Sequence, residues 1–404
     1  MHTPADPTTG AAEAPHVATP SKPVLGLHPV IPLVTTAHFA VDSYTNIYAP
    51  LLPVLIPHLG MTLATAGVLA MVFQLASSVA QLGFGAMADR SSPRLLVLGG
   101  PAVAAAFLSL IGLAPSVWAL AAMLVLGGLG SAAFHPPAAM LAHRFGGRRR
   151  GLAMSVYITG GTLGFAGGPL VATQVVERFG LDATPWMAVP GLVLVALLVR
   201  RVPAIPPPPR GATSGWRPLR PYARPLGLLW AIVVLRTITS SAFVLFAPVL
   251  LTGRGMSVAQ AGIAVACYLF ASGVGGFLGG PAADRFGARR VILWSLLVSA
   301  PLLVAAPLAE GGWFLVLATA GGFCLQSTLP VNVTFGQAIA PVSAGMVSSL
   351  MMGVAWGTGS MAVPLVGAAG DAFGIAPVLS AVGLLPLVGA LLARPLPTSG
   401  LADS

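Results

Sequence analysis

GMTLATAGVLAMVFQLASSVAQLGFGAMADR occupies residues 60–90, and both of its ends return 195 residues later in the chain. Its opening, GMTLATAGV, matches GMSVAQAGI at 255–263, and its close, GAMADR, matches GPAADR at 280–285. GLAMS at 151–155 also returns as GMVSS at 345–349, at an offset of 194. Three matches in one order and at nearly one spacing predict two related halves, each containing six helices.

The composition is typical of a chain that crosses a membrane many times. Of its 404 residues, 56% are hydrophobic and only 7% are charged, and the mean hydropathy is +0.89. A soluble domain carries about 25% charged residues, and apolar runs of about 20 residues can cross a bilayer. We therefore predict an all-α integral membrane protein with twelve transmembrane helices in two pseudo-symmetric six-helix bundles. The expected spans are 31–57, 63–87, 95–113, 117–141, 152–176, 184–200, 226–250, 258–282, 290–309, 313–338, 344–369 and 374–393.

Polar stretches divide the chain into five expected parts. Residues 1–28 are rich in Pro, Thr and Ala and lack the basic start and apolar core of a signal peptide, so we predict a disordered cytoplasmic tail. The N-terminal bundle is expected over 29–200 and the C-terminal bundle over 226–395. The Pro- and Arg-rich stretch 201–225 is interpreted as a cytoplasmic linker between them. A short C-terminal tail, 396–404, completes the chain.

The net charge of +10 is spread over short loops, which argues against nucleic-acid binding. With the N-terminus inside, 17 of the 20 Lys and Arg residues fall in inner segments, two in outer loops and one, Arg236, within a span. Cytoplasmic loops are enriched in Lys and Arg. Both termini are therefore predicted to lie in the cytoplasm, with the chain in the inner membrane of a bacterium.

Two short inner turns share a pattern of glycine, aspartate and arginine, namely Gly85, Asp89, Arg90 and Arg94 in the first turn and Gly280, Asp284, Arg285, Gly287, Arg289 and Arg290 in the second. Glycine permits close helix packing, and aspartate with basic residues can form ion pairs at a helix end. Alternatively, the arginines only hold the loops inside, which accounts for Arg but not for the repeated Gly and Asp.

This pattern resembles the signature loop of the major facilitator superfamily. The second copy is nearly complete, whereas Ser92 and Pro93 stand in the first copy where Gly and a further residue are expected. The resemblance implies the two-bundle transporter fold. It also implies that the Asp-Arg pairs of both loops stabilise the outward-open state and take part in switching between states.

A narrower resemblance points to the fosmidomycin resistance protein group of exporters, and it rests on FQLASSVAQ (73–81), FHPPAAMLAHRFGGRRRGLAMS (134–155), GGTLGFAGGPL (160–170) and GMVSSLMMGVAWGTGS (345–360). Within the third stretch, Gly164, Gly168 and Pro169 are similar to the glycine-proline motif of superfamily antiporters. Ala172 and Thr173 stand where a further glycine pair often follows. The resemblance implies export of a small drug.

One span contains a carboxylate in its middle. An ionised acid at this depth costs about 2.5–3.5 kcal/mol on insertion scales, yet Asp42 lies there with His38 and Asn46 at four-residue spacing, which predicts one polar stripe on a helix.

Arg236 is the one deep Lys or Arg, and the repeat maps it to Asp42 or to His38, depending on the offset. Either Asp42 and Arg236 form a static ion pair, or they pair in one state only and Asp42 carries a proton. His38 either shares that proton or only hydrogen-bonds Asp42.

Further polar side chains in spans are expected to line a central cavity or to bridge helices: Gln74, His135, Tyr157, Gln326 and Asn332. In the exporter group an acid often follows His-Pro, but Pro137 stands there, which leaves more of the proton coupling to Asp42. A zinc site built from His38, Asp42 and His135 matches no strong ligand spacing, so no metal is expected.

The chain has no Walker sequence, nucleophile elbow or catalytic carboxylate pair, so we expect neither ATP use nor an enzyme, and no cofactor. We predict a monomeric secondary transporter that exports a small molecule in exchange for protons through a cavity containing Asp42, His38 and Arg236. The arginine favours an anion, and the resemblance implies a phosphonate antibiotic. A proton-coupled or facilitative importer is the main alternative, and a non-transporting membrane sensor is a remote one.

Overall fold

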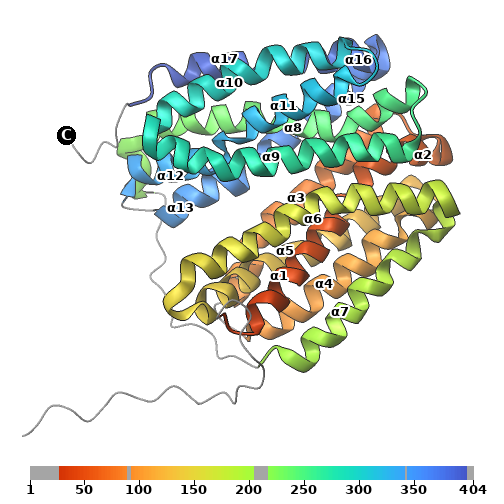
Figure 1. The fold of residues 1–404 in the computed structure, drawn as a ribbon, viewed down its shortest axis with the longest axis horizontal. Coiled ribbons are helices and arrows are strands. Elements are labelled where there is room, and N and C mark those ends of the chain that lie inside the picture. The colour runs from red at the N-terminus through yellow and green to blue at the C-terminus, as the bar shows by residue number, and fades with distance from the viewer. Residues whose placement is uncertain (1–26, 89–91, 204–216, 342–343, 398–404) are drawn as a thin grey trace, which may run out of the picture.

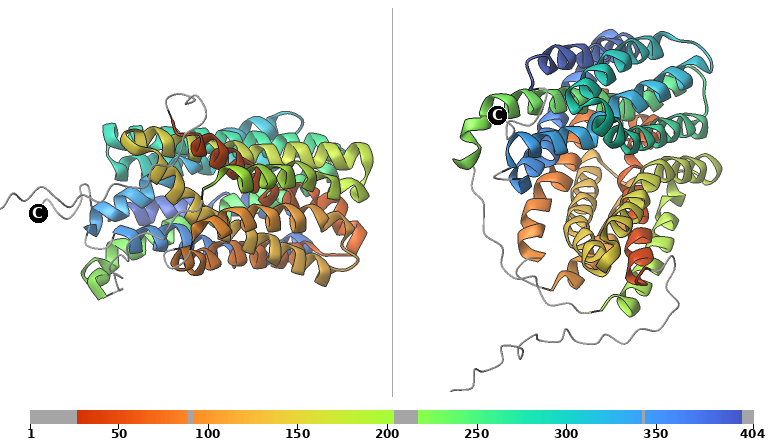
Figure 2. Two further views of the ribbon diagram at one scale, coloured as in Figure 1. Left: turned by 90° about the horizontal axis from the view of Figure 1, so that it is seen from below. Right: turned by 60° about the vertical axis from the view of Figure 1, so that its left-hand side comes forward.

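The computed structural model describes residues 27–88, 92–203, 217–341 and 344–397, and nearly all of these residues are helical. The helices form two bundles, one built from the N-terminal half and one from the C-terminal half of the chain (Figure 1). The right-hand view of Figure 2 also shows the two bundles as an upper and a lower group. The predicted two-bundle, all-α fold is confirmed for the described residues.

The N-terminal bundle contains α1 (Val30–Thr45), α2 (Tyr48–Leu59), α3 (Leu63–Ala88), α4 (Pro93–Ser109), α5 (Val117–Phe145), α6 (Arg150–Phe179) and α7 (Ala188–Arg201). Short 3₁₀ segments at Leu110–Leu113, Gly147–Arg149 and Leu181–Met187 extend or join these helices. The start of α5 has a side-chain cap, because Ser116 accepts a hydrogen bond from the Ala119 N–H.

The C-terminal bundle contains α8 (Ala223–Gly253), α9 (Val258–Phe286), α10 (Ala288–Ala305), α11 (Trp313–Gln326), α12 (Thr328–Ile339), α13 (Ala344–Ser348), α14 (Ala355–Ser360), α15 (Val363–Phe373), α16 (Ile375–Val382) and α17 (Leu385–Ala393). A π-helical turn, Ser349–Val354, joins α13 to α14. The repeated Gly-Met pairs precede α3 and α9, and both glycines, Gly60 and Gly255, have positive φ angles of 59° and 88°. Only glycine adopts such angles readily, which accounts for its return in the repeat.

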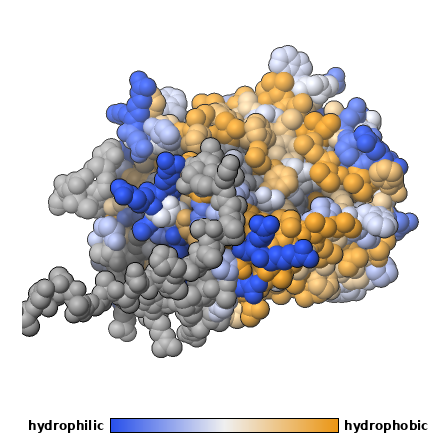
Figure 3. Space-filling view, turned by 60° about the horizontal axis from the view of Figure 1, so that its bottom comes forward, coloured by the Kyte–Doolittle hydropathy of each residue, from blue (hydrophilic) through white to orange (hydrophobic). Residues whose placement is uncertain are grey.

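Ten helical segments of the described chain are long and apolar enough to cross a membrane. They correspond to ten of the twelve expected spans. The other two expected spans correspond to α1 with α2, each of which is short, and to α6, which is long but less apolar. Large apolar side chains such as Leu95, Phe277 and Leu365 are more than 70% exposed. Figure 3 shows apolar side chains over much of one flank, with hydrophilic ones gathered toward the helix ends, as a lipid-facing surface requires.

The first span is broken, which corrects the expectation of one helix over 31–57. α1 ends at Thr45, and Asn46 donates from its side-chain Nδ2 to the Asp42 carbonyl at 3.0 Å. Thr45 also donates to that carbonyl, so side chains satisfy it at the helix end. Pro50 lacks an N–H and could not have continued the hydrogen-bond pattern back to residue 46. Asn46 therefore ends a helix and does not extend a polar stripe.

The bundles meet at one end of the molecule, which we call the closed end. α6 packs against α9, and α3 packs against α15, while α2 packs against α8 and α9 of the other bundle. A Cβ on Gly262 of α9 would overlap Thr173 of α6, and a Cβ on Gly273 would overlap Thr162, near the middle of the two helices. Beyond that point α6 and α9 diverge (Figure 1), and a Cβ on Gly151 of α6 or Gly280 of α9 would meet no atom within 4 Å.

Two carboxylates fasten the closed end. Asp371, at the end of α15, accepts hydrogen bonds of 2.9 Å from the backbone N–H groups of Leu63 and Ala64 at the start of α3. Glu177, at the end of α6, accepts one from the backbone N–H of Ala259 at the start of α9. Each carboxylate thus caps a helix of the opposite bundle, where free N–H groups and the helix dipole favour negative charge. We call these two contacts the carboxylate clasps.

Replacing Asp371 with alanine should loosen the closed end, because an N-cap acceptor contributes about 0.5–2 kcal/mol, equivalent to a shift of about 2- to 30-fold in population. Spin labels at the exposed positions Phe179 and Phe373, at the ends of α6 and α15, can follow the distance between bundles by pulsed electron resonance. We expect a new longer-distance population in Asp371→Ala, on a background with Cys267 and Cys324 replaced by serine. Asp182→Ala, which removes an exposed acid with no clasp, should leave the distances unchanged, and an equal shift in both variants would contradict the clasp.

Candidate functional site

A ridge of glycines on α6 lets α1 approach unusually closely. Gly160, Gly164 and Gly168 recur every four residues, so they lie along one face of the helix. A Cβ on any of them would collide with the backbone of α1, at the carbonyl groups of Thr35, Phe39 and Ser43 respectively. The predicted glycine motif on the fifth span is therefore a helix-packing surface. It also sets the position of every α1 side chain that faces α6.

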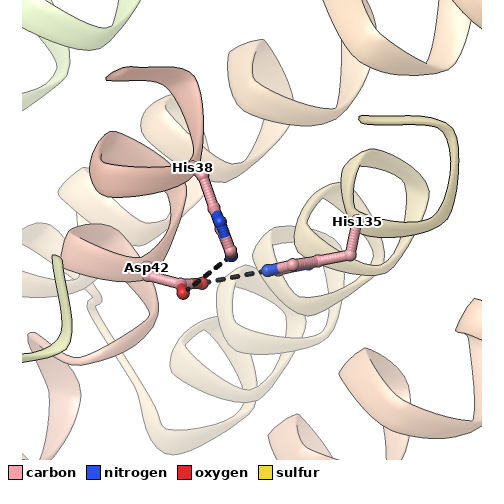
Figure 4. A group of neighbouring side chains, drawn as sticks. All are labelled: His38, Asp42 and His135. Atoms are coloured by element: carbon pink, nitrogen blue, oxygen red, sulfur yellow. Dashed lines mark hydrogen bonds and ion pairs between the residues drawn. The ribbon is translucent and has the colours of Figure 1, made fainter. Parts of the chain in front are cut away.

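Asp42 is held between two histidines (Figure 4). His38, one turn earlier on α1, places its Nε2 3.2 Å from Asp42 Oδ2. His135, on α5, places its Nε2 3.0 Å from Asp42 Oδ1. Asp42 is 3% exposed, so water cannot solvate its carboxylate fully, and the two rings take the place of water. We call His38, Asp42 and His135 the acid cluster.

The backbone fixes the orientation of both rings. His38 Nδ1 lies 2.8 Å from the Tyr157 carbonyl oxygen on α6, and its ring stacks on the Tyr157 ring with centroids 4.2 Å apart. His135 Nδ1 lies 2.8 Å from the Ser131 carbonyl oxygen, one turn earlier on α5. Gly161 leaves the necessary space, since a Cβ there would lie 2.5 Å from His38 Nε2 and 2.6 Å from Asp42 Oδ2. Three helices therefore aim two imidazoles at one carboxylate, an arrangement suited to binding and passing protons.

The C-terminal bundle holds the buried arginine. Arg236, on α8, is 3% exposed and donates from Nη1 to Gln326 Oε1 on α11. Gln326 in turn donates from Nε2 to Ser240 Oγ at 2.9 Å, and the Tyr268 hydroxyl contacts the same oxygen at 3.4 Å. The Nε of Arg236 is buried without a hydrogen-bond partner, and no carboxylate of the described residues pairs with the guanidinium. The charge is thus hydrogen-bonded but not neutralised.

The expected ion pair between Asp42 and Arg236 is not formed in this conformation. Both oxygens of Asp42 face histidines of its own bundle, and Arg236 is turned to Gln326. A static pair that ties the bundles together is therefore excluded for the arrangement described here. The alternative, a pair that forms in another state only, stays a prediction.

Of the remaining cavity candidates, Asn46 and Tyr157 meet the acid cluster through hydrogen bonds that involve a backbone carbonyl, whereas no described hydrogen bond joins Gln74 or Asn332 to it. Asn46 caps the end of α1, and Gln74 on α3 donates to Ser78 Oγ at 2.7 Å. Asn332 on α12 is 1% exposed, and neither its Oδ1 nor its Nδ2 has a partner. Tyr157 contributes its ring and carbonyl, while its buried hydroxyl has no partner.

The signature loops are described only in part. Asp89 and Arg90 lie outside the described residues, and Gly85 is on α3 with the Pro136 Cβ of α5 3.8 Å from its Cβ position. Arg94 donates to the carbonyls of Val199 and Val202, so it caps the end of α7. Arg94 therefore holds the start of α4 to the end of α7 within the N-terminal bundle.

In the second loop, Gly287 turns the chain between α9 and α10 with a φ of 88°. Asp284 is exposed and forms no ion pair with a described residue, so the expected pairing at the helix end is not seen here. Arg285 lies over the Phe286 ring at 5.3 Å, and Arg289 donates to the Arg394 carbonyl. Gly280 and Arg290 make no described contact with the N-terminal bundle.

The acid cluster is also the one group of described residues that could offer three ligand atoms to a metal, since these atoms lie within 4.8 Å of one another. These are the same three residues considered as a zinc site from the sequence alone, although no ligand spacing in the sequence predicts that they meet. A structural zinc site takes four protein ligands, and no fourth His, Cys, Asp or Glu among the described residues joins these three. A metal-free site stays the prediction.

Comparison with known proteins decides the family. A family model described as Major Facilitator Superfamily matches residues 34–252 and, a second time, residues 229–403. The chain belongs to the major facilitator superfamily. It is a membrane transporter, and the double match reflects the two halves seen in the repeat and in the fold.

Three relatives illustrate the similarity. The uncharacterized MFS-type transporter YfnC of Bacillus subtilis is 30% identical over 92% of this chain and 94% of its own. The fosmidomycin resistance protein of Escherichia coli is 28% identical over 95% of both chains. The crystal structure of a bacterial homolog of the human lysosomal transporter Spinster, inward-facing and occupied, matches with a TM-score of 0.80 at 18% identity over 95% of this chain and 99% of its own. The superfamily fold and the resemblance to the fosmidomycin resistance group are thus confirmed.

Several functional neighbours escaped sequence reasoning. Gly160 and Gly161 belong to the face that receives α1, and the four-residue spacing of Gly160, Gly164 and Gly168 was a readable signal for the first of them. Ser240 and Tyr268 complete the network around Arg236 through Gln326, and no spacing connects them.

Gly164→Ala should destabilise this transporter, because the added methyl group would collide with the Phe39 carbonyl, and backbone cannot move aside cheaply. Overpacking of this kind costs about 1–3 kcal/mol, so the apparent melting temperature in detergent should fall. Gly151→Ala is the matched control on the same helix, since its Cβ position is open. It should leave the melting temperature unchanged or raise it, because alanine favours helix over glycine. Equal effects of the two substitutions would rule out the close packing of α1 on α6.

Proposed function

We propose that this transporter exports small organic anions from the bacterial cytoplasm across the inner membrane in exchange for protons, by alternating access. The observation that carries the proposal is the separation of two buried charged groups between the bundles. The deep acid lies in the N-terminal bundle with two histidines, and the deep arginine lies in the C-terminal bundle without a counter-ion. Ionisable groups inside membrane segments commonly mark ion and substrate pathways.

The acid cluster is the proposed proton site. Asp42 and His38 would bind protons from one side of the membrane and release them to the other, with His135 as a third member. A carboxylate between two imidazoles can exchange protons over a single hydrogen-bond length, here 3.0 and 3.2 Å. The bundles need only change the access of water to this site.

Arg236 is the proposed anchor for the substrate. A guanidinium can donate two parallel hydrogen bonds to a carboxylate or phosphonate, and its charge favours anions. Its buried Nε is unpartnered, and Gln326, Ser240 and Asn332 would supply further polar contacts. The name of the fosmidomycin resistance protein, which is 28% identical, supports a phosphonate among the substrates and supports export.

The distribution of Lys and Arg supports cytoplasmic termini. In that orientation the carboxylate clasps face the periplasm, and the described arrangement is closed to the outside. The signature loops would then meet each other only in the opposite, outward-open state. This fits their lack of contact with the opposite bundle in the described residues.

A second candidate, proton-coupled uptake of the same anions, is favoured by the signs of the charges. A protonated acid cluster is neutral or positive, and Arg236 is positive, so protons and an anion would strengthen each other's binding. Export in exchange for protons requires the anion and the protons to occupy the transporter in turn, whereas coupled uptake requires them to be bound at the same time. The direction of gradient-driven transport distinguishes these mechanisms.

Asp42→Asn should abolish gradient-driven transport, because an amide cannot release a proton to either side. Proteoliposomes with an imposed pH gradient can be screened with fosmidomycin, other phosphonates, carboxylates and neutral drugs. We expect wild-type protein to move an anion against its gradient and Asp42→Asn to allow at most downhill flux of the same compound. Asp182→Asn, at an exposed acid, is the matched control and should behave as wild type. Full uphill accumulation by Asp42→Asn would refute the coupling role.

Arg236→Gln should weaken anion binding selectively. A hydrogen bond to a charged group contributes about 1.5–3 kcal/mol, so KM for anionic substrates should rise about 10- to 100-fold, while neutral substrates, where any are found, keep their KM. Arg178→Gln removes an exposed arginine and should have no such effect. If KM for the anion is unchanged in Arg236→Gln, the arginine is not the anchor.

A further inference from the structure

We infer that the acid cluster holds two protons at once in the described conformation, beyond the proton that each ring keeps on Nδ1. The inference rests on the proposed function for the use made of these protons. The number of protons is a property of the chain alone and can be measured without a substrate.

The first step concerns the Nδ1 atoms. A backbone carbonyl oxygen can only accept a hydrogen bond. His38 Nδ1 lies 2.8 Å from the Tyr157 carbonyl oxygen, and His135 Nδ1 lies 2.8 Å from the Ser131 carbonyl oxygen. The Ser131 hydroxyl is farther from His135 Nδ1, at 3.4 Å, so the carbonyl contact decides where this ring proton lies. Both Nδ1 atoms must therefore carry a hydrogen. In a neutral imidazole the other nitrogen, Nε2, is then a bare acceptor.

The second step concerns the two contacts with Asp42. Each joins an Nε2 to a different carboxylate oxygen, at 3.2 Å for His38 and 3.0 Å for His135. Without a proton between them, a bare Nε2 and a carboxylate oxygen would face each other with lone pairs and repel. Each contact thus requires one proton, on either the ring or the carboxyl group. No single proton can serve both contacts, because they involve different oxygens and different rings.

Among the described residues, no charged or titratable side chain next to the cluster supplies or replaces these protons. Tyr157 is the titratable side chain of α6 that stacks on the cluster, and a phenol keeps its proton far above neutral pH. The other charged side chains of α4, α5, α6 and α7 lie at the ends of those helices, as Arg94 does when it caps α7. Arg236 on α8 is turned to Gln326.

Binding or release of two protons reverses the sign of the net charge of the acid cluster. With both bound, the cluster has a formal charge of +1, and with both released it has a charge of −1. The loaded cluster therefore repels Arg236 of the opposite bundle, and the emptied cluster attracts it. This makes proton release a driving force for bringing the two bundles together at the depth of the site. Release of only the first proton, from +1 to neutral, would remove the repulsion without supplying the attraction.

The count can be made on the wild-type protein in lipid nanodiscs at pH 7.5, where an ordinary imidazole is mostly neutral. Nitrogen-15 NMR of labelled histidine counts doubly protonated rings, with His38→Gln and His135→Gln used for assignment. Infrared difference spectra against Asp42→Asn report whether the carboxyl group is protonated. We expect the number of doubly protonated histidine rings and the number of protonated Asp42 carboxyl groups to add up to two per chain. His143→Gln, at an exposed histidine of α5, should leave the sum unchanged.

Asp42→Asn provides the sharpest comparison. An asparagine can accept from one ring through its oxygen and donate to the other through its amide, so only one extra proton is needed. The number of doubly protonated rings in this variant should therefore be one. A wild-type sum of one or zero would overturn the inference, and so would two doubly protonated rings in Asp42→Asn. A stoichiometric metal found in the purified protein by mass spectrometry would also overturn it, because a cation would then replace the protons.

Transport gives a separate readout. With a substrate that the proteoliposome screen has verified, and with the membrane potential clamped at zero, a gradient of one pH unit should sustain about 100-fold accumulation for two protons and about tenfold for one. A ratio near tenfold would overturn the use of both protons in transport. If no compound is transported at all, the proposed function is wrong. The number of bound protons is then still tested by the NMR and infrared measurements, which need no substrate.

Discussion

The close approach of α1 to α6 is the constraint on which the site depends. With no side chains at Gly160, Gly164 and Gly168, the two backbones touch. That contact puts the Tyr157 carbonyl within reach of His38 and leaves room at Gly161 for the Asp42 carboxylate. A buried charge is tolerated when hydrogen bonds replace its hydration. Here, helix packing alone brings the replacement groups into place.

The break after α1 connects this site to the opposite bundle. α1 ends one turn beyond Asp42, where the side chains of Thr45 and Asn46 donate hydrogen bonds to the Asp42 carbonyl. The next helix, α2, packs against α8 and α9. A displacement of the C-terminal bundle would therefore act on α2 and, through the break, on the last turn of α1. The acid cluster therefore lies between the close contact of α1 with α6 and the segment that packs against the C-terminal bundle.

Much of the architecture could be predicted from sequence because it follows from composition and from an internal repeat. Composition and the repeat are properties of whole segments, so an error of a few residues in a helix boundary does not change the predicted fold. The partners of Asp42 could not be predicted in the same way. The repeat maps Arg236 to Asp42 or to His38, but symmetry-equivalent positions need not touch. Which way Asp42 points is decided by the glycine face of α6, more than 100 residues away, and His135 reaches it from a third helix. The break at Asn46 was missed because hydropathy does not respond to one asparagine and a later proline.

The carboxylate clasps have the form of a symmetric dimer contact. Asp371 of the second half holds the start of α3 in the first, and Glu177 of the first half holds the start of α9 in the second. In a two-fold homodimer such a contact is isologous: one residue on each subunit grips the same feature of the other. Two copies of a single six-helix half would make both contacts with one acid per copy. The closed end therefore has the self-complementary form of an isologous interface within a single chain, with the two acids supplied by separate residues.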